Sequence, residues 1–170
     1  MKTLCLILAT LLLATVAFAG NAPAKSSSDA AAAFDRLKTL AGEWEATTDR
    51  GKVRLNYELI AGGNSIIERE SGENMPEMLT VYYLDGNRLL LTHYCMAGNQ
   101  PRMEARTFNS QTGELRFQFL DITNLANANA GHMRNVTLHL VDNNHLSSEW
   151  QFFENGQPKL TERAQYTRVR

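Results

Sequence analysis

The chain has few cysteines and no excess of charge of either sign, and both absences exclude classes of protein. Its 170 residues include 17 Lys and Arg, 18 Asp and Glu, and two Cys, at positions 5 and 95. Nucleic-acid binders and polybasic membrane-surface proteins need basic residues clustered well in excess of acids, and the sequence has no such cluster. The Cys-x-x-Cys and His-Glu-x-x-His spacings of zinc sites are also missing. The length corresponds to one domain.

The first 19 residues have the composition of a secretory signal peptide. Met1-Lys2 gives a positive start, Leu4 to Phe18 is an apolar run without charge, and Ala17-Phe18-Ala19 has the small-x-small form that signal peptidase reads. The run is shorter than the ~20 residues of a spanning helix, so a retained membrane anchor is the less favoured alternative. We expect a secreted or periplasmic protein without stable membrane insertion after cleavage, in which Cys95 cannot form an internal disulfide.

Two segments precede the strands. Residues 20–28 are small and polar and contain a proline, which is typical of a flexible leader. From Asp29 to Ala41 the alanine run and the spacing of Phe34, Leu37 and Leu40 predict a short helix with one apolar face, ended by Gly42. We expect residues 29–170 to form a single domain in which this helix covers another element.

From Glu43 onward the sequence alternates with a period of two, and glycine-containing turns separate the strand-like runs. Consecutive strands joined by short turns pair with their neighbours, and full closure removes the exposed edges of a sheet. We therefore predict an all-β fold, an up-and-down antiparallel barrel of about ten strands with a short N-terminal helix; a sandwich is the alternative. The expected strands are Glu43 to Asp49, Val53 to Ala61, Ser65 to Ser71, Glu77 to Leu84, Arg88 to Met96, Arg102 to Phe108, Glu114 to Leu120, His132 to Val141, His145 to Phe153 and Lys159 to Val169.

The interior of this barrel is expected to be partly polar. The run from Glu114 to Phe119 alternates cleanly and points Leu115, Phe117 and Phe119 inward. Two other runs, 88–96 and 159–169, mix polar and apolar residues, so the sequence does not decide which of their faces points into the barrel. An unsatisfied buried polar group costs about 1 to 3 kcal/mol, so such an interior is hydrated or holds a ligand, and a barrel of this size can enclose one small molecule.

A helix that runs into Leu37-Lys-Thr-Leu-Ala-Gly42-Glu-Trp44, followed by meandering strands, resembles the lipocalin-like (calycin) barrels. Within that group the chain is most similar to the ten-stranded nitrobindin and fatty-acid-binding-protein architecture, and segments such as Thr92 to Cys95 are similar to those of bacterial exported proteins of this kind. The resemblance spans residues 29–170. It implies structural roles for Gly42 and Trp44, with the Trp44 ring packed across the closed end of the barrel.

The two better-known relatives imply different sites. Fatty-acid-binding proteins hold a carboxylate with an Arg-x-Tyr pair on the last strand, and here Tyr166 and Arg168 stand in the reverse order. Nitrobindins bind haem iron through a late His, for which His139 and His145 are the candidates, but Ala46 replaces a glycine of their motif. Haem is therefore an alternative that the sequence does not favour, and we expect no cofactor.

His93 and Cys95 lie two residues apart and share a face of one strand. With nearby methionines, such a set could bind a soft metal such as copper, and the weak metal candidates are His93, Cys95, His132, His139 and His145. The same pair could act as base and nucleophile, but nothing marks an oxyanion hole, so an enzyme is the less favoured reading. The favoured interpretation is a buried Cys beside a hydrogen-bonded His.

The leading functional hypothesis is an exported protein that binds a small apolar or amphipathic ligand. We expect Arg102, His93 and His132 to line a mouth that two loops, Gly98 to Arg102 and Asp121 to Gly131, partly cover. A haem- or metal-binding barrel and a ligand-free structural or interaction module are the alternatives. The candidate ligand-binding residues are His93, Arg102, Phe117, Phe119, His132, Trp150, Tyr166 and Arg168.

Overall fold

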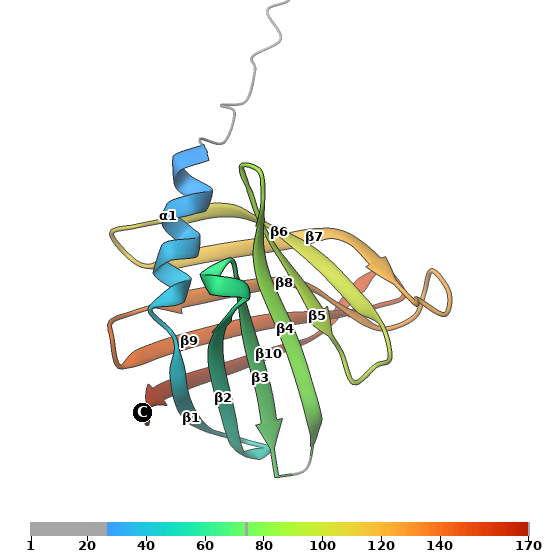
Figure 1. Cartoon of the computed structure of the whole chain (residues 1–170). Helices are drawn as coiled ribbons and strands as arrows, with labels where there is room; N and C mark the ends of the chain where they lie inside the picture. The colour runs from blue at the N-terminus through green and yellow to red at the C-terminus, as the bar shows by residue number, and fades with distance from the viewer. Residues whose placement is uncertain (1–26, 74, 170) are drawn as a thin grey trace, which may run out of the picture.

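A computed structural model describes residues 27–73 and 75–169, which form a closed barrel of ten antiparallel strands (Figure 1). The strands follow one another around the barrel in chain order, and β10 (Gln157–Arg168) pairs with β1 (Gly42–Thr48) to close it. The predicted all-β fold and strand number are confirmed. The predicted signal peptide lies outside the described residues, as does the predicted leader except for Ser27 and Ser28, which begin the helix.

Each predicted strand is present, and most ends differ from the predicted ones by one or two residues. The largest difference is at β7, which continues past the predicted end at Leu120. The remaining elements are α1 (Ser27–Lys38), β2 (Gly51–Ile60), the short 3₁₀ helix η1 (Ala61–Gly63), β3 (Ser65–Gly72), β4 (Met75–Asp85), β5 (Arg88–Tyr94), β6 (Gln100–Asn109), β7 (Glu114–Thr123), β8 (His132–Leu140) and β9 (His145–Glu154).

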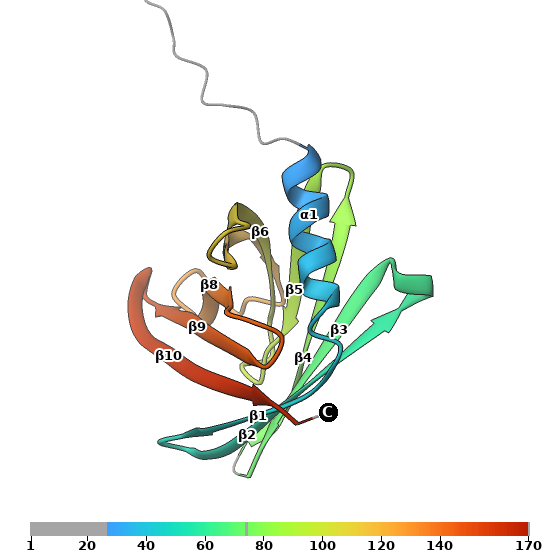
Figure 2. The same ribbon diagram turned by 90° about the vertical axis from the view of Figure 1, so that its left-hand side faces the viewer.

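Helix α1 covers one end of the barrel. Figures 1 and 2 show it standing beside the β4–β5 hairpin, and its face with Ala30, Phe34 and Leu37 is buried in the same core as the inward strand residues. The helix ends at Lys38 rather than at the predicted Ala41. The next turn is tighter because the Leu40 amide donates to the Leu37 carbonyl, three residues back, at 2.9 Å.

The junction between α1 and β1 is fixed by Trp44 and Arg168. The fully buried Trp44 ring donates from Nε1 to the Leu40 carbonyl at 2.8 Å. The Arg168 guanidinium lies 4.2 Å from the centre of that ring and donates to the carbonyls of Thr39 and Ala41, each at 2.7 Å. The pairing between β1 and β10 is short, so these contacts help to hold the last strand against the first. Arg168 thus lies at the closed end and is not among the residues that line the pocket described below.

The structure shows which face points inward on the two strands for which the sequence did not decide it. On β5 the inward residues are Leu89, Leu91 and His93, all buried, while Thr92 and Tyr94 face outward. On β10 the inward face carries Ala164 and the buried Tyr166. The half of the barrel next to α1 is filled by apolar side chains. Polar groups gather toward the other half.

The turn between β6 and β7 gives a test of this packing. Gly113 has φ +75°, and a Cβ there would lie 2.3 Å from the Leu140 carbonyl oxygen. The turn cannot move freely, because the Leu140 amide donates to the Gly113 carbonyl at 3.0 Å. Gly113→Ala should cost about 3 kcal/mol in free energy of unfolding, from the positive φ and the clash together.

Gly86→Ala is the matched control, because Gly86 also has a positive φ, +60°, but nothing lies within 4 Å of the added Cβ. It should cost only about 1 kcal/mol. Urea unfolding of both variants measures the difference, and equal losses would contradict the packing at Gly113.

Candidate functional site

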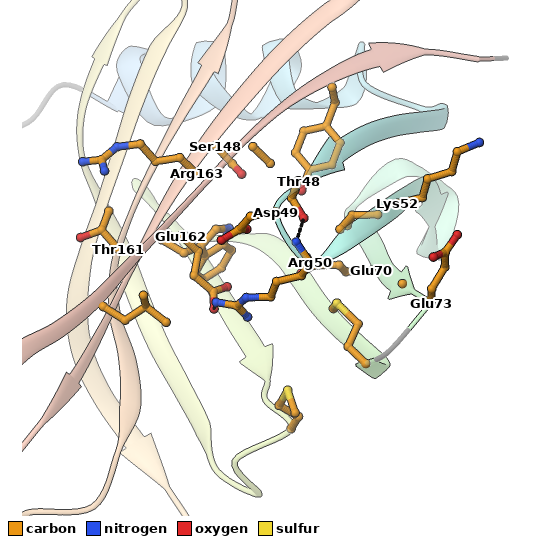
Figure 3. Close-up of a pocket in the computed structure, with 18 residues that line it drawn as sticks. Thr48, Asp49, Arg50, Lys52, Glu70, Glu73, Ser148, Thr161, Glu162 and Arg163 are labelled. Carbon is orange, nitrogen blue, oxygen red and sulfur yellow. Dashed lines mark hydrogen bonds and ion pairs between the residues drawn. The ribbon is translucent and has the colours of Figure 1, made fainter.

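The end of the barrel opposite α1 holds a pocket of about 710 Å³ (Figure 3). It lies between the β1–β2 and β3–β4 turns on one side and strands β9 and β10 on the other. A residue of the β5–β6 loop, Met96, completes it. The lining residues are Thr48, Asp49, Arg50, Lys52, Val53, Glu70, Gly72, Glu73, Met75, Met96, Ser148, Trp150, Leu160, Thr161, Glu162, Arg163, Ala164 and Tyr166.

Strand β3 brings two carboxyl groups to the inner side of the barrel. Alternation along β3 places Glu68 and Glu70 on the same face as the fully buried Ile66. Glu68 is 3% exposed and accepts a hydrogen bond of 2.6 Å from the Tyr82 hydroxyl. Burial raises the pKa of Glu68, and the neighbouring hydroxyl groups of Tyr57, Tyr82 and Thr80 oppose that shift. This carboxyl is thus held within a group of hydroxyls, beneath the pocket.

Glu70 lies one step closer to the open end and lines the pocket itself. Burial raises its pKa to about 8, and the negative charges of Glu68 and Glu162 add to the shift, while Arg50 opposes it. Among the described residues, no side chain donates a hydrogen bond to Glu70. A carboxyl with this pKa is largely protonated at neutral pH, and it will lose its proton readily if a positive charge comes close.

The basic residues around the pocket are engaged elsewhere or turned away from its centre. The Arg50 Nη2 atom donates to Glu162 Oε1 at 2.6 Å, which joins the β1–β2 turn to β10 across the rim. Figure 3 shows Lys52 and Arg163 pointing away from the centre of the pocket, and Arg163 pairs with Glu149 at 2.8 Å. Of the acids that line the pocket, Glu162 is thus paired with Arg50 at the rim, and neither Lys52 nor Arg163 points toward the others.

An aromatic wall faces these carboxyl groups. Trp150 of β9 and Tyr166 of β10 both line the pocket, as does Ser148 of β9. Behind Trp150, the His93 ring lies with its centre 4.9 Å from the nearer indole centre. The Nδ1 atom of His93 lies 3.0 Å from Thr80 Oγ1, whereas its Nε2 has no hydrogen-bond partner. Burial lowers the pKa of His93 to about 4, so this ring is neutral at physiological pH.

The structure brings together three of the predicted ligand-binding residues: Trp150 and Tyr166 on the pocket wall, and His93 behind them. Arg102 lies elsewhere, because it pairs with Thr92 across the β5–β6 ladder and so shares the outer face of the sheet. There it forms a two-pronged ion pair with Asp121, with Nε to Oδ1 at 2.6 Å. The guanidinium is thus turned away from the mouth at which the sequence placed it.

The predicted aromatics of β7 and β8 occupy two other places. Phe117 belongs to the apolar core, with its ring centre 5.9 Å from that of Tyr82. Phe119 lies where β7 and β8 part, because their pairing stops at Gln118 and Asn135. In that gap the rings of Phe119 and the buried His132 lie 5.4 Å apart, and the Arg134 guanidinium lies 5.0 Å from the centre of Phe119.

The two predicted loops do meet at the open end of the barrel. The Asn99 side chain donates to the Gly131 carbonyl at 2.8 Å, and Asn124 donates to the Gly98 carbonyl at 2.5 Å. Neither predicted loop lines the pocket; Met96, which does, comes just before the first of them. The second loop braces the first.

The metal and nucleophile hypotheses find little support in the geometry. Among residues 27–73 and 75–169, no three His, Cys, Asp or Glu side chains gather in a way that could hold a metal ion. Burial raises the pKa of the Cys95 thiol and lowers that of His93, so both shifts oppose a thiolate–imidazolium pair.

The histidines considered for haem face elsewhere. His139 lies on the outer face of β8, with Nε2 at 2.6 Å from the Thr112 carbonyl, and His145 pairs with Asp142 in an exposed turn. Neither lines the pocket, so these residues do not fit an arrangement in which a late His binds haem iron.

Sequence reasoning missed the acidic side of the site: Glu68, Glu70, Arg50 and Glu162. The signal was present in the alternation Ile66-Ile-Glu68-Arg-Glu70, which puts two carboxyl groups on one face. It was ambiguous because both faces of this strand begin with an isoleucine. Only the pairing of β3 with β2 and β4 shows which face is inside.

A scan against models of protein families and a search of curated proteins found no match to this chain. What is established is the fold, a closed ten-stranded antiparallel barrel, which is consistent with a calycin-like barrel. Within the part of the chain that the structure describes, no helix has the length and apolar character needed to cross a membrane.

The raised pKa of Glu70 predicts how stability depends on pH. Between pH 4.5 and about 8 an unfolded chain loses the Glu70 proton and the folded chain keeps it, so this group makes stability fall as pH rises. Glu70→Gln should match the parent protein near pH 4.5 and exceed it at pH 8 by about 4 kcal/mol. Urea unfolding across this range tests the shift. A parallel profile for the two proteins would show that Glu70 titrates normally.

His93 predicts the opposite slope on the acid side. Its folded pKa, about 4, lies below the ordinary value of 6.5, so it makes stability fall as pH drops through that interval. His93→Gln should flatten the loss of stability between pH 6.5 and 4, whatever it costs at neutral pH. Thermal unfolding at several pH values measures the slope, and an unchanged slope would contradict the assignment.

Proposed function

We propose that this protein binds a small amphipathic molecule in the open end of its barrel. The observation that carries the proposal is the pocket of about 710 Å³, which lies within the 300–1,000 Å³ of typical ligand sites. One wall offers the rings of Trp150 and Tyr166, and the opposite side offers a single ionisable group, Glu70. This division suits a ligand with an apolar body and one polar end.

The rigidity of the opposite end supports this function. The apolar core, α1 and the Trp44–Arg168 contacts hold the closed half of the barrel, so the pocket does not have to be formed when a ligand binds. A largely preformed site binds without a large cost in conformational entropy. The predicted signal peptide and the calycin resemblance together support an exported carrier or sequestering protein.

A tryptophan placed in the pocket should abolish this binding. Ala164 lines the pocket from β10, so Ala164→Trp would fill part of its volume with an indole ring. The neutral fluorescent probe N-phenyl-1-naphthylamine should bind the parent protein saturably, and Ala164→Trp should weaken that binding at least tenfold.

Gln165→Trp is the matched control, because Gln165 is the next residue on the same strand and is exposed on the outer face. It should leave probe binding within about twofold of the parent value. Circular dichroism and thermal unfolding would establish that both variants fold. Absence of saturable binding to the parent protein would overturn the proposed function, and equal binding by both variants would place the site elsewhere.

A further inference from the structure

The charges around the pocket are unbalanced in a way that favours one class of ligand. Asp49, Glu70 and Glu162 line it, and Glu68 lies just beneath. The one basic group at the rim that is not turned away, Arg50, is already bound to Glu162. Lys52 and Arg163 also line the rim but point away from its centre (Figure 3), so the carboxylates at the rim disfavour an anionic ligand at the centre and attract a cation.

We propose that the ligand carries a protonated amine, which forms an ion pair with Glu70 while its apolar body packs against Trp150 and Tyr166. The inference rests on the proposed function and specifies the chemical class of its ligand. Glu70 is the one carboxyl group of the pocket wall that is inside the barrel and has no hydrogen-bond donor among the described residues. An ammonium group supplies both the missing donor and the missing charge.

The aromatic wall adds a second observation in favour of a cation. The faces of Trp and Tyr rings attract a positive charge within about 6 Å, and the attraction grows when the site excludes water. Behind Trp150 the His93 Nε2 atom is buried and without a hydrogen-bond partner.

Binding of an amine should release a proton from Glu70, which gives the inference a specific signature. Titratable groups on several elements interact electrostatically with Glu70. They are Arg50 from the β1–β2 turn, Glu68 from its own strand, Tyr82 from β4, Cys95 after β5, and Glu162 and Tyr166 from β10. None of the other acids in this set is arranged to take up the proton: Glu162 is paired with Arg50, the Glu68 carboxyl already accepts the Tyr82 hydroxyl, and the tyrosines keep their own protons. The proton therefore leaves to the solvent.

The test compares three ligands that share a phenyl body: 2-phenylethylammonium, neutral 2-phenylethanol and anionic 3-phenylpropanoate. Each is used to displace N-phenyl-1-naphthylamine from the parent protein between pH 6 and 8, with calorimetry in two buffers to count protons. The amine should bind most tightly, its affinity should rise about tenfold from pH 6 to 7 and level off near pH 8, and about one proton should be released at pH 7.

Glu70→Gln should remove this pH dependence and weaken binding of the amine at pH 8 at least tenfold, while binding of the neutral probe stays within about twofold. Glu58→Gln is the matched control, because Glu58 is exposed on the outer face of the adjacent strand β2 and loses the same charge. It should behave as the parent protein does.

The remaining outcomes separate the inference from the function on which it rests. If 3-phenylpropanoate binds best, with affinity that rises as pH falls, or if 2-phenylethanol binds as tightly as the amine, the amine inference is wrong and the binding function stands. The same holds if the probe binds and none of the three ligands displaces it. If the probe itself does not bind, the proposed function fails, and the inference fails with it.

Discussion

The placement of one buried and one half-buried carboxyl group on the inner face of β3, with no cation among the described residues paired to either, is the constraint on which the open half of this structure depends. Glu68 meets it by accepting a hydrogen bond from Tyr82 within a cluster of hydroxyls. Glu70 has no such partner, and burial raises its pKa, so the carboxyl group stays largely protonated at neutral pH. Retaining a half-buried acid without a partner costs stability. Such a group is more readily understood as part of a binding site than as part of a core.

The rest of the fold isolates this polar half from the apolar one. Helix α1, the buried Trp44 ring and the Arg168 guanidinium close the far end, and the apolar side chains between them exclude water from half of the barrel. At the near end, the Arg50–Glu162 ion pair joins the β1–β2 turn to β10, and two asparagines tie the loops after β5 and β7 together. The pocket thus has a fixed floor and a braced rim.

The sequence predicted the strands well because each is bounded by a turn residue and follows a simple period. It could not predict which face of β3 or β5 is inside, since Ile66 and Ile67, or Leu90 and Leu91, make both faces apolar. Arg102 illustrates a second limit: its partner Asp121 is 19 residues away, and only the pairing of β6 with β7 reveals the contact. The helix was placed correctly, but its last turn depends on the tight junction with β1. Of the site itself, the aromatic wall was foreseen in Trp150 and Tyr166, and the acidic side was not.

The most direct test of the account is the titration of the Glu70 carboxyl carbon by NMR, assigned by its loss in Glu70→Gln. The account predicts a midpoint at pH of about 8 in the free protein, well above the ordinary value of 4.5. Saturation with 2-phenylethylammonium should move this midpoint down by more than one unit. A midpoint near 4.5 in the free protein would contradict the account, because Glu70 would then be a solvated carboxylate at the rim and the interior would carry no unpartnered acid.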